Sequence, residues 1–306
     1  MRSRGVTARV PAKVNLQLSV GPLGSDGFHE VTTVFQAISL FDDVTVATAE
    51  SNDGIKISIS GQTSNGVPVD NSNLAVKAAQ LMIENYDLPK DLIIKLKKEI
   101  PVAGGMAGGS ADAAGVIVGL DSLFELGLSR DEMESVGSKI GSDVPFSICG
   151  GVAIGTGRGD QITPALAKGN YNWVLALSGQ GLSTPAVYGE CDRLREGLSI
   201  APPVVSEQLM QALRAGDAKA LGKALTNELQ PAACSLRPAL RLVLDVGVDY
   251  GALGGIVSGS GPTVAFLVSD DDHAMDLTVA LSSSGVVSSV VRANGPTHGA
   301  RIIESF

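Results

Sequence analysis

The sequence has little of several features that would mark particular protein classes. It contains 3 cysteines in 306 residues. Because Cys149, Cys191 and Cys234 are odd in number and far apart, they form neither a disulfide framework nor a metal-ligand spacing. The histidines are equally scattered, so no His/Cys metal cluster is predicted. No apolar run approaches the roughly 18 residues of a membrane span. No apolar stretch follows Arg2 and Arg4, so a signal peptide is not predicted.

The chain also lacks an excess of basic residues. The formal net charge is −9, which argues against a surface that binds nucleic acid or an anionic membrane. Aromatic residues make up only 4% of the chain, whereas glycine is abundant at 37 residues. We therefore expect a cytoplasmic, enzyme-like chain that would hold an anionic substrate with a few placed cations and backbone N–H groups.

The most informative segment is the run Pro101-Val-Ala-Gly-Gly-Met-Ala-Gly-Gly-Ser-Ala111. Alternating apolar residues predict a strand over 92–98 before it, and three- and four-residue spacing predicts a helix from Ala111 to about Gly127 after it. A helix N-terminus preceded by glycines favours anion binding, because its N–H groups are unpaired and no side chain blocks them. The spacing of Gly104 and Gly109 matches a Walker loop, but Ser110 stands where that motif has lysine. The missing cation must come from elsewhere.

The remaining pattern predicts two α+β halves, residues 1–165 and 166–306, divided in the polar, glycine-rich stretch 156–170. Strands over 43–47 and 55–60 flank Asn52-Asp53-Gly54, which is a hairpin signal. Residues 141–146 are predicted to be a short constrained loop. From 173 onward the order β-α-β-β-α-β, with extra helices and a last strand over 286–292, is that of a ferredoxin-like split βαβ.

Lys13 and Asp143 are the candidate catalytic residues. Taken alone, Lys13 is also explained as a solvated lysine, and Asp143 is also explained as a turn residue. Beside a phosphate cradle they fit phosphoryl transfer, in which a carboxylate accepts the proton of the attacking hydroxyl and an ammonium steadies the negative charge.

Three further segments, 26–29, 184–188 and 259–263, have two open interpretations each. The turn Gly259-Ser-Gly-Pro-Thr263 is explained by backbone geometry, or it supplies N–H groups to another phosphate. Phe28 and Tyr188 are core aromatics, or they stack on a base. His29 has the same two readings, as a structural histidine or as a ligand-binding one.

Together these motifs resemble the GHMP kinase superfamily, through residues 11–16, 101–110 and 259–263. The resemblance extends to Asp26-Gly-Phe-His29, Gly141-Ser-Asp-Val-Pro145 and Thr184-Pro185, and it spans nearly the whole chain. It implies a ribosomal-protein-S5-domain-2-like N-terminal half that binds ATP and carries catalysis, and a ferredoxin-like C-terminal half that binds substrate. The implied reaction is ATP-dependent phosphorylation of the C2 hydroxyl of CDP-methylerythritol, in the non-mevalonate route to isoprenoids.

The resemblance also implies residue roles. Asp143 is the base and Lys13 its charged partner. Asn15 lines the erythritol end of the pocket, His29 reads the cytosine edge, and Phe28 and Tyr188 sandwich the ring. The ATP phosphates bind the segment Pro101, Val102, Ala103, Gly104, Gly105, Met106, Ala107, Gly108, Gly109, Ser110 and Ala111. The other expected substrate contacts are Thr184, Gly259 and Ser260.

Two departures from the family pattern stand out. Members often have tyrosine where this chain has Phe28, and the glutamate that holds magnesium in several of them has no evident counterpart. Mg²⁺ is therefore expected as MgATP, with no protein metal ligand named. The alternatives are a homoserine or mevalonate type of kinase, and a non-catalytic nucleotide-binding regulator. The sequence leaves open a monomer or a homodimer.

Overall fold

The computed structural model describes residues 4–49 and 54–306. Most of the N-terminal part builds one large sheet, whose strand order is β12-β1-β2-β4-β3. Strand β5 pairs with β2 and β6, and β8 pairs with β1. The strands of this sheet are β1 (Gly5–Leu23), β2 (His29–Thr48), β3 (Ile55–Ser60), β4 (Leu92–Lys97), β5 (Val152–Thr156), β6 (Gln161–Pro164), β8 (Thr226–Asn227) and β12 (Arg301–Ser305).

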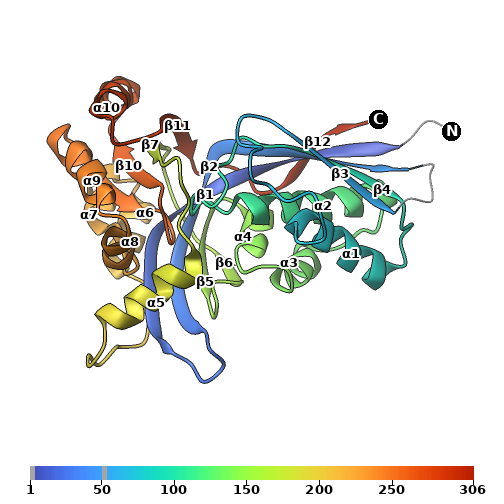
Figure 1. Cartoon of the computed structure of the whole chain (residues 1–306), viewed down its shortest axis with the longest axis horizontal. Helices are drawn as coiled ribbons and strands as arrows, with labels where there is room; N and C mark the ends of the chain where they lie inside the picture. Colours follow the sequence, from blue (N-terminus) through green and yellow to red (C-terminus); the bar gives the residue numbers. More distant parts are fainter. Residues whose placement is uncertain (1–3, 50–53) are drawn as a thin grey trace.

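Four helices cover one face of this sheet (Figure 1). They are α1 (Leu74–Tyr86), α2 (Gly108–Phe124), α3 (Arg130–Ser138) and α4 (Val144–Cys149). Helix α2 is central and mostly buried, and it packs against β1 and β2. Gly115 allows this close approach, because a Cβ there would stand 2.6 Å from a methyl group of Val44. The glycine-rich segment is therefore held against the sheet by the helix that follows it.

The second sheet has the strand order β11-β7-β10-β9, with every neighbouring pair antiparallel. Its strands are β7 (Tyr171–Leu177), β9 (Gly254–Val257), β10 (Val264–Val268) and β11 (Ser289–Gly295). Taken in chain order this is 4-1-3-2, which confirms the ferredoxin-like prediction. The helices of this part are α5 (Thr184–Leu194), α6 (Glu207–Ala215), α7 (Ala218–Ala224), α8 (Gln230–Leu236), α9 (Ala239–Asp249) and α10 (Asp271–Ser284).

One hydrophobic cluster contains residues of both sheets. Trp173 of β7 is fully buried in the same cluster as Val14 of β1 and Ile117 of α2. Its indole Nε1 donates to Gln36 Oε1 of β2 at 2.7 Å. Such continuous packing fixes the position of β1, which carries Lys13, relative to the C-terminal half.

Four predictions about local structure were wrong. The hairpin does not form, because β4 lies between β2 and β3; its turn residues Asn52 and Asp53 lie outside the described residues. Helix α2 begins at Gly108 and not at Ala111. The expected loop over 141–146 runs into helix α4, for which Asp143 is the N-cap. The strand expected over 286–292 lies at Ser289–Gly295, and β12 follows it.

Candidate active site

The glycine-rich segment lines a cavity of about 510 Å³. Of the predicted phosphate-binding residues, seven line it: Ala103, Gly104, Gly105, Ala107, Gly108, Gly109 and Ser110. The other four do not. Met106 and Ala111 are buried in the core, whereas Pro101 is half-buried and Val102 is exposed. The predicted cradle residues that line the cavity are therefore 103–105 and 107–110.

The loop has a strained backbone. Ala103 and Ala107 adopt φ values of 51° and 62°, a region that alanine rarely enters. Gly105 has φ +77°, and a Cβ there would stand 2.1 Å from the carbonyl oxygen of Ser258. No side chain caps helix α2. Because the first N–H groups of a helix need partners from outside it, this end of α2 suits an anion.

Lys13 and Asp143 lie together at this cavity, although 130 positions separate them in sequence. Lys13 Nζ is 3.7 Å from Asp143 Oδ2. Lys13 comes from β1 and is 4% exposed, while the Asp143 side chain is 30% exposed. The Asp143 side chain makes no capping hydrogen bond to helix α4, so its carboxylate faces the cavity without that backbone partner.

Polar neighbours orient the Lys13 side chain. Its Nζ donates to Asn15 Oδ1 at 2.6 Å, and it lies 5.5 Å from the centroid of the Phe35 ring. Asn15 is fixed in turn, because its Nδ2 donates to Thr33 Oγ1 at 2.8 Å. Burial lowers the pKa of Lys13, and the negative charge of Asp143 opposes that effect. The neighbours therefore orient the ammonium group of Lys13, and nearby negative charge favours its protonated form.

The second glycine-rich turn packs directly against the first. Ser258 Oγ donates to the carbonyl oxygen of Gly105 at 3.1 Å, and Thr263 N donates to that of Gly104 at 3.3 Å. A Cβ at Gly259 would stand 3.2 Å from Lys13 Nζ. Gly259 and Ser260 line the same cavity. The turn, which belongs to the C-terminal half, therefore positions the glycine-rich loop and also faces the site.

Asn227 anchors this turn, although no sequence motif points to it. Its Nδ2 donates to the carbonyl oxygens of Val257 and Gly259, at 2.7 and 2.8 Å. Thr184 Oγ1 lies 2.9 Å from Ser260 Oγ, so the predicted contact residue Thr184 meets the turn at the start of α5.

A second cavity, of about 760 Å³, adjoins the first and contains the predicted cytosine-binding residues. The two cavities share Val31, Ser142, Arg158, Thr184, Pro185 and Tyr188 among their lining residues. His29 lies in the second, with Nδ1 2.8 Å from the carbonyl oxygen of Gly21 and Nε2 3.3 Å from Asp192 Oδ1. The hydroxyl of Tyr188 is kept protonated, since burial, followed by the charge of Asp143, raises its pKa to about 12.

Phe28 and Tyr188 both line the second cavity, but each ring already has another partner. Tyr188 contacts His29, with ring centroids 5.3 Å apart. The guanidinium of Arg158 lies 3.8 Å above the Phe28 ring and forms an ion pair with Asp26 at 3.0 Å. Arg158 was missed by sequence reasoning, since a single arginine in a glycine-rich turn is no signal by itself. It is the cation that lines both cavities among the described residues.

Residues 4–49 and 54–306 hold no group of three or more His, Cys, Asp or Glu side chains arranged to bind a metal ion. Within the same ranges, no helix combines the length and apolarity needed to cross a bilayer. Asp143 is the one carboxylate among the described residues that line the first cavity.

The fold and this paired loop-and-turn site define a class. Residues 73–151 match the GHMP kinases N terminal domain and residues 209–287 match the GHMP kinases C terminal domain, so the chain belongs to the GHMP kinase family. It is 51% identical over 302 residues to the 4-diphosphocytidyl-2-C-methyl-D-erythritol kinase of Rhodococcus jostii, covering 98% of this chain and 96% of that protein.

Solved structures agree with this assignment. A crystal structure of 4-(cytidine 5'-diphospho)-2C-methyl-D-erythritol kinase superposes with a TM-score of 0.73 at 30% identity, covering 94% of this chain and 98% of that chain. The L. major mevalonate kinase superposes with a TM-score of 0.76, covering 95% of this chain and 96% of that one. Its identity is 16%, so it shows the shared fold alone.

Proposed function

We propose that this chain transfers the γ-phosphoryl group of ATP to the C2 hydroxyl of 4-(cytidine 5'-diphospho)-2-C-methyl-D-erythritol. The observation that carries the proposal is the Lys13–Asp143 pair, 3.7 Å apart, where a glycine-lined cavity meets one with aromatic and histidine side chains. A phosphoryl donor and a cytidine-containing acceptor would occupy the two cavities and meet at this pair.

In the proposed reaction, Asp143 accepts the proton of the C2 hydroxyl as its oxygen attacks the γ-phosphorus. The bond from that phosphorus to the bridging oxygen breaks, and ADP leaves. Lys13 and the N–H groups of the loop balance the negative charge on the phosphoryl oxygens. Magnesium, when bound with ATP, supplies further charge neutralisation. Because the first cavity offers Asp143 as its one described carboxylate, the nucleotide itself would hold most of that ion.

The acceptor assignment depends on the second cavity. Phe28 and Tyr188 supply aromatic faces and His29 a polar imidazole edge, which suit a pyrimidine. Arg158 spans both cavities and would face the diphosphate that joins cytidine to methylerythritol. Mevalonate and homoserine carry neither group. The division at residue 165, the cytoplasmic location and the oligomeric state stay predictions.

The test is an ADP-release assay that compares CDP-methylerythritol with mevalonate and homoserine, with the product identified by phosphorus NMR. We expect turnover with the cytidine compound alone, and a new phosphomonoester at C2. Turnover with mevalonate or homoserine instead would overturn the acceptor assignment. ADP release that does not depend on any acceptor would overturn the kinase proposal.

A further inference from the structure

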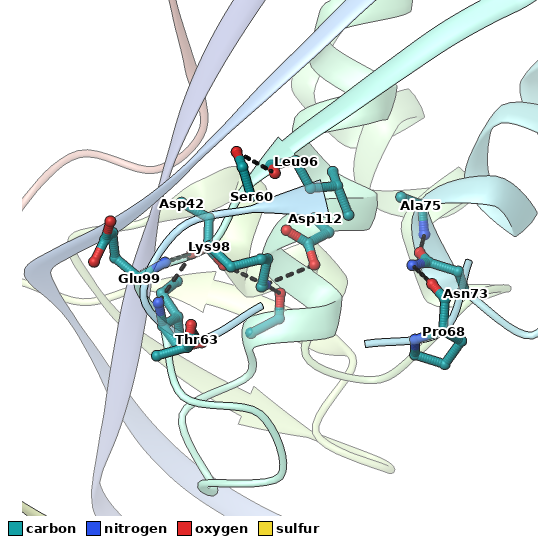
Figure 2. Close-up of polar contacts among 12 residues, drawn as sticks. Asp42, Ser60, Thr63, Pro68, Asn73, Ala75, Leu96, Lys98, Glu99 and Asp112 are labelled. Carbon is teal, nitrogen blue, oxygen red and sulfur yellow. Dashed lines mark hydrogen bonds and ion pairs between the residues drawn. The ribbon is translucent and has the colours of Figure 1, made fainter. Parts of the chain in front are cut away.

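A buried ion cluster of Asp42, Lys98 and Asp112 lies beneath the glycine-rich loop (Figure 2). The three residues are 0%, 1% and 2% exposed, and they line neither cavity. Lys98 Nζ donates to Asp42 Oδ2, to Asp112 Oδ2 at 2.6 Å and to the carbonyl oxygen of Gly108 at 3.1 Å. The cluster is therefore separate from the Lys13–Asp143 pair.

Its contacts fall at both ends of the loop. At the entry, Asp42 Oδ1 accepts hydrogen bonds from the backbone N–H groups of Glu99 and Ile100, at 2.6 and 2.9 Å. At the exit, Gly108 begins helix α2 and Asp112 lies one turn further along it. Lys98 joins the two ends, so the cluster sets the distance that residues 101–107 must span.

Stability alone is a poor reason for such a cluster. Two carboxylates share one ammonium, and Asp112 Oδ1 is buried without a hydrogen-bond partner. Buried ion pairs commonly contribute no more to stability than apolar side chains of similar size would. What a cluster of this kind does provide is a defined geometry, since each contact has a fixed length and direction.

We propose that Asp42, Lys98 and Asp112 are positioning residues, which hold both ends of the glycine-rich loop at the span in which its N–H groups take the phosphates of ATP. The inference rests on the proposed function only in placing the nucleotide at this loop. It requires that loss of the cluster weaken nucleotide binding and leave the acceptor cavity unaffected, because the cluster touches no residue of that cavity.

Two substitutions at one position form the test. Asp112→Ala removes the contact at the exit and leaves the charge-balanced pair Asp42–Lys98, so the fold should persist. Asp112→Asn is the matched control: its amide oxygen can still accept from Lys98, and its NH₂ group takes the unpartnered position. We expect the Kd for ADP, measured by calorimetry, to rise about tenfold in Asp112→Ala, equivalent to about 1.4 kcal/mol. We expect it to stay within about twofold in Asp112→Asn.

The KM for the acceptor should change less than about twofold in both variants, a split that a general loosening of the protein would not produce. Equal ADP affinity in the two variants, or an acceptor KM that rises as much as the Kd for ADP, would overturn the inference. ADP binding is measured without acceptor, so a wrong acceptor assignment would leave this comparison intact.

Amide hydrogen exchange of the unsubstituted protein gives a second reading. The N–H groups of Glu99 and Ile100 should exchange slowly even without nucleotide, because the cluster already holds them, while ADP should slow exchange over residues 104–110. Fast exchange at Glu99 and Ile100 without ADP would contradict a preformed clamp, whether or not Asp112→Ala folds.

Discussion

Replacement of Lys13 by methionine tests the proposed catalytic pair most directly. Methionine fills a similar volume and removes the charge. At the 3.7 Å that separates Lys13 Nζ from Asp143 Oδ2, a unit charge interacts with the ammonium by about 4 kcal/mol at an effective dielectric constant of about 20. A phosphoryl oxygen in transit to an acceptor at Asp143 would lie comparably close to Lys13.

That energy corresponds to a fall in kcat of roughly 10³-fold. Solvent at the partly exposed Asp143 screens the charge and reduces the expected fall in kcat toward roughly 10²-fold. Loss of one preorganised donor costs a similar factor in other enzymes, about 10² to 10³. We therefore expect kcat of Lys13→Met to fall by a factor of roughly 10² to 10³.

The assay is steady-state ADP release with saturating ATP and acceptor, accompanied by a thermal melt to confirm folding. Lys95→Met is the matched control, because Lys95 is an exposed lysine on β4, which β2 separates from β1 in the same sheet, and the change should leave kcat unchanged. A folded Lys13→Met protein whose kcat stays within tenfold of the unsubstituted value would refute the role given to Lys13.

Three further substitutions address the base, the stacking surface and the buried cluster. Asp143→Asn should abolish turnover while the Kd for ADP stays within a few-fold, because the loop is intact; unchanged turnover would remove Asp143 from the reaction. Phe28→Ala should raise the KM for the cytidine substrate by a factor equivalent to about 1–3 kcal/mol of lost stacking, and an effect confined to ATP would contradict that role. Burial, opposed by Lys98 and reinforced by Asp42, raises the pKa of Asp112 to about 7. The folded protein therefore holds a proton that the unfolded chain loses above about pH 4, so the free energy of unfolding should fall as the pH rises toward 7. In urea titrations at pH 5 and 8, Asp112→Asn should lose less stability than the unsubstituted protein, by at most about 4 kcal/mol; parallel losses would show that Asp112 does not titrate there.

Periodicity and capping signals predicted the elements that the local sequence defines. The Ser129-Glu132 capping box forms at the start of α3, and the last strand of the ferredoxin-like half lies only a few residues from its predicted position. The hairpin failed because β4 pairs with both β2 and β3, a long-range choice that a local turn signal cannot report. The start of α2 was misplaced because Gly108 and Gly109 are poor helix formers, yet packing holds them in its first turn.

The same distinction holds for the candidate site, where residues in local motifs were predicted and residues that depend on distant neighbours were not. Motifs led to Lys13, Asp143 and the loop, because these residues sit in short recognisable segments. Arg158 and Asn227 could not be found, since their roles depend on neighbours far away in sequence. Lys98 did leave a signal. Leu92, Ile94 and Leu96 place every second residue of β4 inward, so the same alternation continued to position 98 points a lysine into the core.

The pairing of β12 with β1 has a consequence for biosynthesis. Thr7 lies opposite Glu304 in this antiparallel pair, so β1 leaves the ribosome long before its partner strand β12 is translated. Until then, the edge of β1 that pairs with β12 has unpaired backbone N–H and C=O groups. It can therefore pair with a strand of another molecule. Nascent chains should consequently need a chaperone, or rapid completion of translation, to escape aggregation.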